Sequence, residues 1–489
     1  MRRPHLMSSA YRLGALINIF CVILSGECLA ISVTNTNDSG AGSLRAAILA
    51  AAAGDTIQFD SSLAGKTITL ASSLPSITQP LTIMGLGASQ LTIVGDQWHN
   101  VFQVDAGVTA QISGLTVAAG TTYSAIENSG YLSVMKCVLS GGRAIDFNGD
   151  YGGTLTVSNC NISHSGDGIH YGSYQGNGGT LTVTSSVISN NSGSGIYVYD
   201  LSSGANTSVQ NCTISGNSHH GIYNPKTLNI TNSTISGNGV ASDNGGGIFN
   251  DVSGTVTVIN STISGNTAFC GGGVWNEGTL ISKNSTIARN TASSAGGGIY
   301  EGGLGNATLM NTIVANNASG TGPDIDGAVT ANYCLVGNTN GAGTITGTGN
   351  ILNQDPILAW LGSYGGPTMT EPLLPGSPAL DTGSNALIPS GLTTDQRGLP
   401  RIYPANGTVD IGAYEYQPVV PSISISKQGT NVVLSWPTSA MGYILMSSTN
   451  LGSSAVWITN SPLPVVVNGQ NTVTNPISGP RKFFRLRHP

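Results

Sequence analysis

One recurring phrase constrains the fold of this 489-residue sequence more than any other feature. Asn-Ser-Thr-Ile-Ser-Gly-Asn occurs at 232–238 and 260–266, and related copies begin 21 to 28 residues apart. A second phrase, Gly-Gly-Gly-Ile-aromatic-Asn, alternates with it, so each period holds two short segments rich in Thr, Val and Ile. Such segments, bounded by Gly, Asn and Ser, are typical of strands separated by turns. A period of this length predicts a solenoid of paired coils, here a parallel β-helix.

Alternation along each strand assigns side chains to the interior or the surface. The aliphatic residue of the second phrase points inward, so Ile222, Ile248 and Val274 are expected to stack in one interior column. The Asn two residues later, as at Asn224 and Asn250, is expected to hydrogen-bond from coil to coil at a bend. The same bend position is occupied by Asn276 in the next coil.

Five cysteines follow the first thirty residues, and an odd, sparse set of this kind is not a disulfide framework. Cys137 and Cys160 share a register position on adjacent coils, with α-carbons expected roughly 5 Å apart. Their side chains would run parallel, which suits a disulfide poorly. The cysteines are therefore expected to be mostly small core residues.

Composition narrows the class of protein further. Charged residues make up only 8% of the chain while Gly contributes 68 residues, which excludes a coiled coil. With 39% hydrophobic residues the chain can bury a large core, which argues against general disorder. The net charge of -6 provides no overall basic surface. We therefore expect nucleic acid and anionic lipid to be poor partners.

The first thirty residues have the layout of a secretory signal peptide. Arginines at positions 2, 3 and 12 precede an apolar run over 13–24, and small residues follow up to Ala30. We expect cleavage after Ala30 and a secreted or cell-surface mature chain. The apolar run is too short to span a bilayer comfortably, and no later stretch approaches twenty apolar residues, so no membrane span is expected.

Both ends of the predicted coil stack, residues 81–352, need a cover because an open coil exposes strand edges. Residues 31–80 are expected to form an N-terminal cap and the first strands, with a short amphipathic helix over 43–50. Residues 353–416 lose the repeat, become rich in Pro and Gly, and are expected to close the other side.

The central repeats resemble secreted right-handed β-helix repeat proteins, including polymorphic outer-membrane proteins and pectate lyases of the pectin lyase-like fold. This resemblance implies a right-handed coil. Residues 353–416 resemble the choice-of-anchor Q segment of exported bacterial proteins, through motifs such as Gly-Gly-Pro-Thr at 365–368 and Thr-Asp-Gln-Arg-Gly at 394–398. That resemblance implies bacterial export with display at the cell surface or outer membrane, and implies no catalysis. After a stiff linker at 417–421, residues 422–489 resemble a fibronectin-type β-sandwich used for attachment.

A row of outward residues directly follows the inward aliphatic residues of the second phrase. Glu127, Asp146 and His170 begin this row, and five successive coils then place an aromatic residue in it. The five aromatic residues are Tyr197, Tyr223, Phe249, Trp275 and Tyr300. The row is either a platform for sugar rings or an aromatic ladder that stabilises its own stack.

Acidic residues indicate a second candidate site. Asp251 and Glu277 share a register position, and Glu301 is expected close by. These carboxylates either bind calcium or are solvated turn residues. No other cofactor is expected.

A third cluster has residue types suited to acid and base catalysis. Asp146, Asp150 and Asp167 fall on neighbouring coils, with His164 and His170 nearby. Half of this cluster is expected on loops.

The sequence therefore predicts an all-β protein: a right-handed parallel β-helix followed by a small β-sandwich. Its expected function is non-catalytic glycan binding or adhesion by a secreted or cell-surface monomer. A carbohydrate-active enzyme is the alternative, as a polysaccharide lyase before a glycoside hydrolase. A structural component of the cell envelope or matrix is the third.

Overall fold

The computed structural model describes residues 30–173, 178–200, 204–418, 421–438, 443–452, 455–477 and 481–487. The described residues divide into two compact units: those up to 182 together with 204 and 205, and those of 183–200 together with those from 206 onward. The expected signal peptide lies outside the described residues except for Ala30. Within the described residues, no helix is long and apolar enough to cross a membrane.

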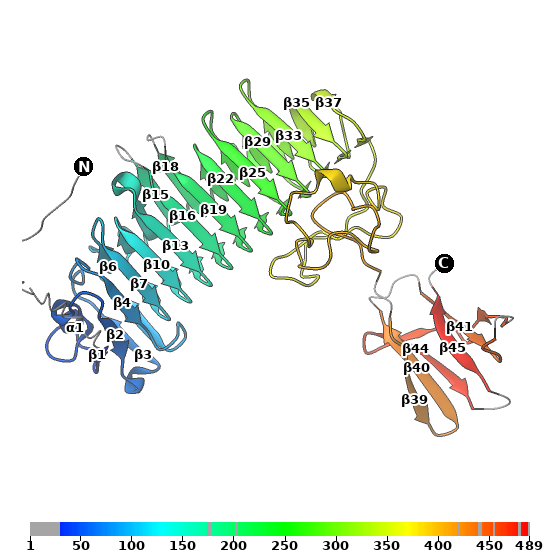
Figure 1. Ribbon diagram of the computed structural model, residues 1–489, viewed down its shortest axis with the longest axis horizontal. Coiled ribbons are helices and arrows are strands. Elements are labelled where there is room, and N and C mark those ends of the chain that lie inside the picture. Colours follow the sequence, from blue (N-terminus) through cyan, green and yellow to red (C-terminus); the bar gives the residue numbers. More distant parts are fainter. Residues whose placement is uncertain are drawn as a thin grey trace, which may run out of the picture. The chain divides into compact units, whose positions relative to one another are not determined.

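The first unit is a stack of coils whose strands form three faces, and equivalent strands of neighbouring coils pair in parallel (Figure 1). Its first face consists of β1 (Ala30–Val33), β2 (Thr56–Phe59), β4 (Leu81–Met84), β7 (Thr109–Ser113), β10 (Tyr131–Met135) and β13 (Thr154–Ser158). Its second face consists of β3 (Lys66–Thr69), β5 (Leu91–Val94), β8 (Thr116–Ala118), β11 (Val138–Ser140) and β14 (Asn161–Ser163). Its third face consists of β6 (Phe102–Val104), β9 (Ser124–Asn128), β12 (Arg143–Asn148) and β15 (Asp167–Ser173). Two 3-10 turns, η1 (Ser61–Leu63) and η2 (Gly149–Tyr151), complete it, and β16 (Thr180–Thr184) contains the boundary between the units.

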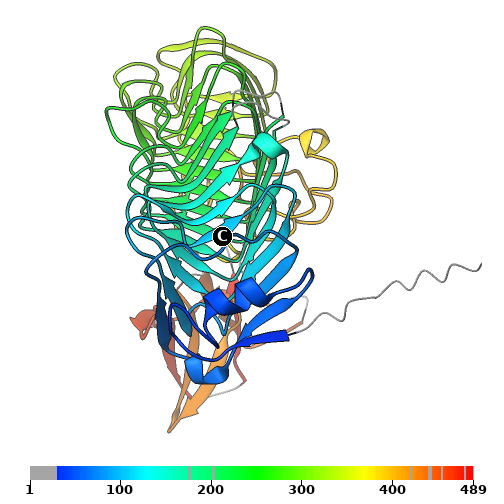
Figure 2. The same ribbon diagram turned by 90° about the vertical axis from the view of Figure 1, so that its left-hand side faces the viewer.

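The expected short helix is present near the start of the first unit as α1 (Leu44–Ala50). Ser43 caps it by accepting a hydrogen bond from the Ala46 amide at 3.1 Å. Its apolar side, with Leu44, Ala47 and Ile48, is buried. Figures 1 and 2 show α1 beside the first coils of this unit.

The second unit repeats the three-faced coil. Its first face consists of β19 (Asn206–Gln210), β22 (Thr227–Thr231), β25 (Thr255–Ile259), β29 (Thr279–Lys283), β33 (Asn306–Met310), β35 (Ile325–Asn332) and β37 (Ala342–Thr346). Its second face consists of β17 (Val187–Ser189), β20 (Thr213–Ser215), β23 (Thr234–Ser236), β26 (Thr262–Ser264), β30 (Thr286–Ala288), β34 (Ile313–Ala315), β36 (Leu335–Val336) and β38 (Ile351–Leu352). Its third face consists of β18 (Ile196–Asp200), β21 (Ile222–Asn224), β24 (Ile248–Asn250), β28 (Val274–Asn276) and β32 (Ile299–Glu301), and β35 pairs with β32 as well as with β33. A short parallel pair, β27 (Thr267–Cys270) and β31 (Thr291–Ala295), lies in the loops before this face.

The Asn that opens each copy of the first phrase sits at a sharp turn between the first and second faces. Asn211, Asn232 and Asn260 have φ angles of 53°, 51° and 53°, in the left-handed region. Asn enters this region more readily than other residues with a side chain, because its short polar group can hydrogen-bond locally. The turn therefore explains why the phrase begins with Asn.

Equivalent inward residues stack in columns, as the repeat predicts. Ile222 pairs with Ile248 and Ile248 with Val274, and all three are fully buried. Beside this column, the Asn224 amide donates to Asn250 Oδ1 at 3.0 Å, and the Asn250 amide donates to Asn276 at 2.6 Å. The predicted Asn ladder at the bend is thus confirmed.

A second, longer Asn ladder runs through the interior at the last Asn of the first phrase. Each side-chain amide donates to the side-chain oxygen one coil further on, at 2.8 to 3.0 Å. Its members are Asn191, Asn217, Asn238, Asn266, Asn290 and Asn317. Sequence reasoning gave these residues no role. The ladder satisfies polar groups that would otherwise be buried without partners.

The five cysteines that the structure describes are all buried. The Cys137 amide lies 3.5 Å from Cys160 Sγ, so these two residues do occupy adjacent coils. The same register position in the second unit carries Cys212 and Ser233, where the Cys212 amide donates to Ser233 Oγ at 3.1 Å. The small side chains therefore fill one column without forming a disulfide there.

Residues 353–416, which we call the lateral segment, lie along the side of the second unit. The segment contains the 3-10 turn η3 (Asn385–Leu387). Its Gln396 donates to Thr234 Oγ1 at 3.0 Å and accepts from Thr262 Oγ1 at 2.6 Å, on strands β23 and β26. Leu373 and Ile411 pack with residues of the second face in one buried cluster. A cover was expected at the end of the stack, whereas these contacts run along its second face.

Residues after 421 form two antiparallel sheets (Figure 1). One sheet has the order β39 (Ser424–Gln428), β40 (Asn431–Pro437), β44 (Gln470–Pro476) and β43 (Val465–Val467). The other has the order β42 (Ile458–Thr459), β41 (Ile444–Ser448) and β45 (Phe483–Arg487). Leu434, Trp436, Leu445 and Val473 form the core of this C-terminal module.

A substitution at Gly273 tests how closely the third face packs against the Asn ladder. A Cβ at this position would lie 2.5 Å from the Gly298 carbonyl oxygen and 3.0 Å from Asn290 Nδ2. Because the backbone oxygen cannot move aside, we expect Gly273→Ala to lower the free energy of unfolding by about 1–3 kcal/mol in denaturant titrations. Gly303→Ala is the matched control, since nothing lies within 4 Å of its added Cβ. Equal midpoints for the two variants would contradict the packing described.

Candidate functional site

The five predicted aromatic residues form one continuous column on the third face of the second unit. Tyr197 pairs in register with Tyr223, Tyr223 with Phe249, Phe249 with Trp275, and Trp275 with Tyr300. Their ring centroids are 4.8, 5.1, 5.9 and 4.3 Å apart along the column, with interplanar angles of 15° to 23°. The rings are thus stacked in succession, and each is half-buried.

Tight glycine turns let the strands carry these rings. Gly271, in the left-handed region with φ of 67°, opens the second phrase in the Trp275 coil. A Cβ there would lie 2.7 Å from the Trp275 backbone, so the close approach requires glycine. This is the reason that a run of glycines precedes the aromatic residue.

Further contacts fix the middle of the column. The His220 ring packs against Tyr223 and Phe249, with centroids 5.7 and 5.4 Å away. His220 Nδ1 lies 3.0 Å from the Gly245 carbonyl oxygen and must donate, because a carbonyl can only accept. Burial lowers the pKa of His220, which keeps the ring neutral. The Tyr223 hydroxyl donates to Asp251 Oδ2 at 3.0 Å.

Stacking determines which parts of the rings can meet a ligand. The two faces of each inner ring are turned toward its neighbours in the column, so its solvent-facing part is an edge. A sugar ring packs best on an open aromatic face, whereas this column uses its faces internally. The geometry therefore accounts for a stabilising ladder, and the inner rings offer a sugar only their edges.

His170 belongs to the first unit, where it joins a row of polar side chains. Asp146 pairs in register with Glu127 on one side and with His170 on the other. Asp146 Oδ1 lies 2.9 Å from His170 Nδ1, and Asp146 Oδ2 accepts from Arg143 at 2.8 Å. Burial alone would raise the pKa of Asp146, but the hydrogen bonds and charges of His170 and Arg143 outweigh it and lower the pKa. Glu127 accepts from Asn100 and Gln103 at 2.5 and 2.8 Å.

Two further members of the predicted acid and base cluster have described contacts of their own. Asp150 accepts from Ser173 Oγ at 3.2 Å. His164 is exposed in the turn after β14 and contacts Ser163. A described contact joins Asp146 with His170, and Asp167 pairs in register with Arg143 of β12.

Of the three calcium candidates, Asp251 and Glu277 follow paired residues of neighbouring coils, and Glu301 takes part in the Asn ladder. Asp251 accepts from Tyr223, while Glu301 takes the ladder position after Asn276, whose amide donates to both Glu301 oxygens at 3.1 and 3.0 Å. Glu277 lies at the adjoining turn. In the described residues, no group of three or more His, Cys, Asp or Glu side chains is arranged to hold a metal ion.

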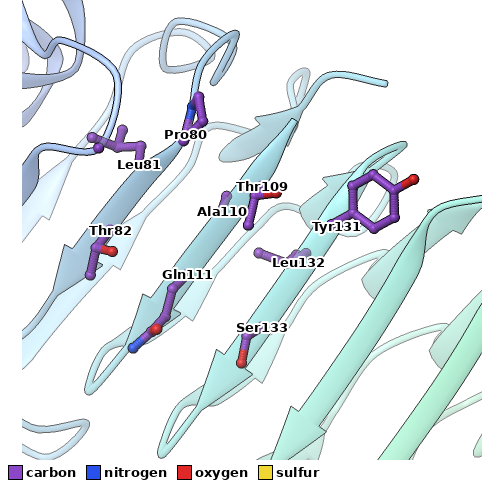
Figure 3. Close-up of a pocket in the computed structure, with 10 residues that line it drawn as sticks. Pro80, Leu81, Thr82, Thr109, Ala110, Gln111, Tyr131, Leu132 and Ser133 are labelled. Carbon is purple, nitrogen blue, oxygen red and sulfur yellow. The ribbon is translucent and has the colours of Figure 1, made fainter. Parts of the chain in front are cut away.

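A hollow on the first face of the first unit was not anticipated (Figure 3). It encloses about 270 Å³ over strands β4, β7 and β10. Thr82, Gln111 and Ser133 stand side by side in register across it, and Thr109 and Tyr131 form a second row. Tyr131 is 43% exposed, and its ring stands at one end of the hollow. Outward Thr and Ser occur on almost every strand, so only the lone Tyr at 131 distinguished this place in the sequence.

The family described as "Right handed beta helix region" matches residues 89–232 and 125–281. The chain is a right-handed parallel β-helix protein. This finding confirms the expected hand of the coil. No curated protein matches the chain.

Three solved structures are similar to this β-helix protein. The mannuronan C-5 epimerase AlgE6 A-module of Azotobacter vinelandii is 15% identical, with 66% of this chain and 99% of that chain covered and a TM-score of 0.46. The catalytic unit of a GH87 α-1,3-glucanase from Streptomyces thermodiastaticus strain HF3-3 is 16% identical, with 67% and 68% covered and a TM-score of 0.41. The Agl-KA catalytic domain is 16% identical, with 64% of each chain covered and a TM-score of 0.34. These likenesses concern the fold alone.

The position of Glu301 at the end of the Asn ladder leads to a prediction of how the free energy of unfolding depends on pH. Burial raises the pKa of Glu301 to about 8, although the Asn276 amide acts in the opposite direction. Since the folded chain then binds the proton more tightly than the unfolded chain, Glu301 should cost stability as pH rises from about 4.5 to 8. We expect Glu301→Gln, which keeps an acceptor for Asn276, to raise the free energy of unfolding at pH 8 by roughly 2 kcal/mol or more.

Thermal unfolding of both proteins across this pH range measures the effect. The difference between them should disappear near pH 4, where the wild-type carboxyl is protonated. Glu277→Gln, at the half-buried turn beside it, is the control and should show no such pH-dependent gain. A constant difference between Glu301→Gln and wild type at all pH values would contradict the assignment.

Proposed function

We propose that this protein binds glycan chains on the side of its β-helix without catalysing a reaction. The observation that carries the proposal is the hollow over β4, β7 and β10, where hydroxyl and amide groups of Thr82, Gln111 and Ser133 lie beside the open Tyr131 ring. Sugar rings present alternating hydroxyl groups and apolar C–H faces. A row of hydrogen-bonding side chains next to one aromatic face is suited to both.

The shape of the hollow favours a polymer over a small cofactor. Sites for small molecules are usually closed clefts of roughly 300–1,000 Å³ that bury most of the ligand. This hollow, at about 270 Å³, is smaller and lies over one face of the coil stack. Equivalent polar side chains recur at about 4.8 Å per coil along that face, so a chain molecule can extend across several coils.

The aromatic column supports a secondary role in the same function. The solvent-facing edges of its rings are the parts that a ligand can reach. Because the inner faces are stacked, we infer that the column mainly stabilises the second unit. Glycan contact there would add to binding at the hollow and would not replace it.

We also propose that the chain acts outside the cytoplasm. The layout of residues 1–30 supports export, and a location at the cell surface agrees with glycan contact. Calcium binding stays a proposal for Asp251 and Glu277 alone, since Glu301 is engaged by the ladder.

Catalysis by a carbohydrate-active enzyme is the second candidate, and the Asp146–His170 pair favours it. An ionised Asp146 that orients His170 is an arrangement used for proton transfer. The same pair, with Arg143 on the other carboxylate oxygen, is also an ordinary surface ion network.

Tyr131→Ala tests the binding proposal. Loss of the open ring should weaken binding of any glycan found on an array by about tenfold, a change of 1.4 kcal/mol, while Tyr131→Phe should retain most of the affinity. Tyr151→Ala is the control, because Tyr151 is 61% exposed and does not line the hollow. Tyr223→Ala with Trp275→Ala should lower thermal stability and change affinity much less. Affinity lost in that double variant but kept in Tyr131→Ala would move the site to the column.

Catalysis is tested by incubating the mature protein with acidic polysaccharides, with and without calcium. We expect no unsaturated products, measured by their ultraviolet absorbance. Products that disappear in His170→Ala would instead identify a lyase and would end the binding-only proposal.

A further inference from the structure

Charge is divided unequally along the chain. Residues 421–489 contain five Lys or Arg and neither Asp nor Glu, whereas residues 31–420 contain nine Lys or Arg and 22 Asp or Glu. The net charge of -6 is therefore the sum of an acidic region, residues 31–420, and a basic C-terminal module. We expected anionic lipid to be a poor partner from the net charge of the whole chain, and that reasoning does not apply to this basic module.

The module also exposes an uncharged apolar strip, which we call the apolar edge, at residues 456–467. Val456, Ile458, Leu463 and Val466 are 75%, 62%, 72% and 67% exposed. Val465 and Val467 are exposed as well, and the strip holds no Lys, Arg, Asp or Glu. Edge strands of soluble proteins are usually protected by charges, whereas here β43 (Val465–Val467) presents aliphatic side chains.

Basic residues adjoin this edge. The Arg485 guanidinium lies 4.3 Å from the centroid of the Trp457 ring, and Trp457 stands between Val456 and Ile458. Arg485 and Arg487 project from β45, in the same sheet as β42, and both are exposed. Arg481 and Lys482 directly precede this strand and are exposed too. Arg485 and Arg487 thus share a sheet with Ile458, at one end of the apolar edge.

We propose that the C-terminal module docks on an anionic phospholipid bilayer, with the apolar edge at the boundary between headgroups and acyl chains. Basic residues near an anionic bilayer are attracted to its headgroups, and aliphatic side chains gain from burial in the interface. Nucleic acid or an acidic glycan would match the cations but offers nothing to Leu463 or Val466. Self-association of two C-terminal modules is disfavoured, because the five Lys and Arg residues of one module would repel the five of the other.

Flotation of the full mature chain with vesicles tests this docking. We expect it to bind vesicles of phosphatidylcholine with phosphatidylglycerol, to bind those of phosphatidylcholine alone weakly, and to be released by high salt. Arg481→Gln with Arg487→Gln should weaken binding about fivefold for each charge removed. Leu463→Ser with Val466→Ser should abolish stable binding, because the residual attraction lacks insertion.

Two control variants match these changes. Ile425→Ser removes an apolar side chain that is 63% exposed on β39, at the other edge of the same sheet as β43, and should bind as wild type. Lys66→Gln removes an exposed cation of the first unit and should also have no effect. Unchanged far-ultraviolet circular dichroism and melting temperature show that each variant is folded.

Three results would overturn the proposal. The first is no binding to anionic vesicles, and the second is equal binding to both vesicle types. The third is concentration-dependent self-association that is lost in Leu463→Ser with Val466→Ser, seen by sedimentation velocity without any vesicle binding. That result would assign the apolar edge to a second copy of the chain.

Discussion

Hydrogen bonding between neighbouring coils is the constraint on which this molecule depends. A backbone group inside a coil stack has no water, so it must find its partner in the coil above or below. The same holds for inward side chains: Asn238 satisfies its amide on Asn266, which in turn requires Asn290. A residue type suited to one coil is therefore suited to the next, and this explains the repetition in sequence. Where a ladder ends, a carboxyl takes the last place, as Glu301 and Asp324 do.

The same register governs the surface. Outward residues of successive coils come within stacking distance whether or not they serve a ligand, so a row of aromatic residues can arise from stability alone. In the column from Tyr197 to Tyr300 the ring faces are turned to one another, which limits what a ligand can reach. Tyr131 differs because the residue one coil earlier in its row is Thr109, which leaves its ring unstacked there. An interruption of a column is thus more informative about binding than the column itself.

Sequence reasoning succeeded where contacts follow the repeat. The spacing of Ile222, Ile248 and Val274 was enough to place them in one column, because successive copies differ by a nearly constant number of residues. It failed where contacts join residues far apart in the chain. Thr234 and Thr262 have the pattern of ordinary outward residues, yet Gln396, more than 130 residues later, covers both. The aromatic column of the candidate site could be predicted from the repeat. The hollow at Tyr131 could not, because it appears only when β4, β7 and β10 are placed side by side.

The opposite charges of the coil region and the C-terminal module show why a single net charge is a poor guide to partners. Charges interact with a surface only within about a Debye length, near 8 Å at physiological ionic strength. A partner at the apolar edge therefore meets Arg485 and Arg487, and the many acidic residues earlier in the chain contribute only if they come that close. Separation of sign along the chain is compatible with both the proposed bilayer contact of the C-terminal module and the proposed glycan contact of the coils. Binding to two chemically different surfaces then requires no compromise within either one.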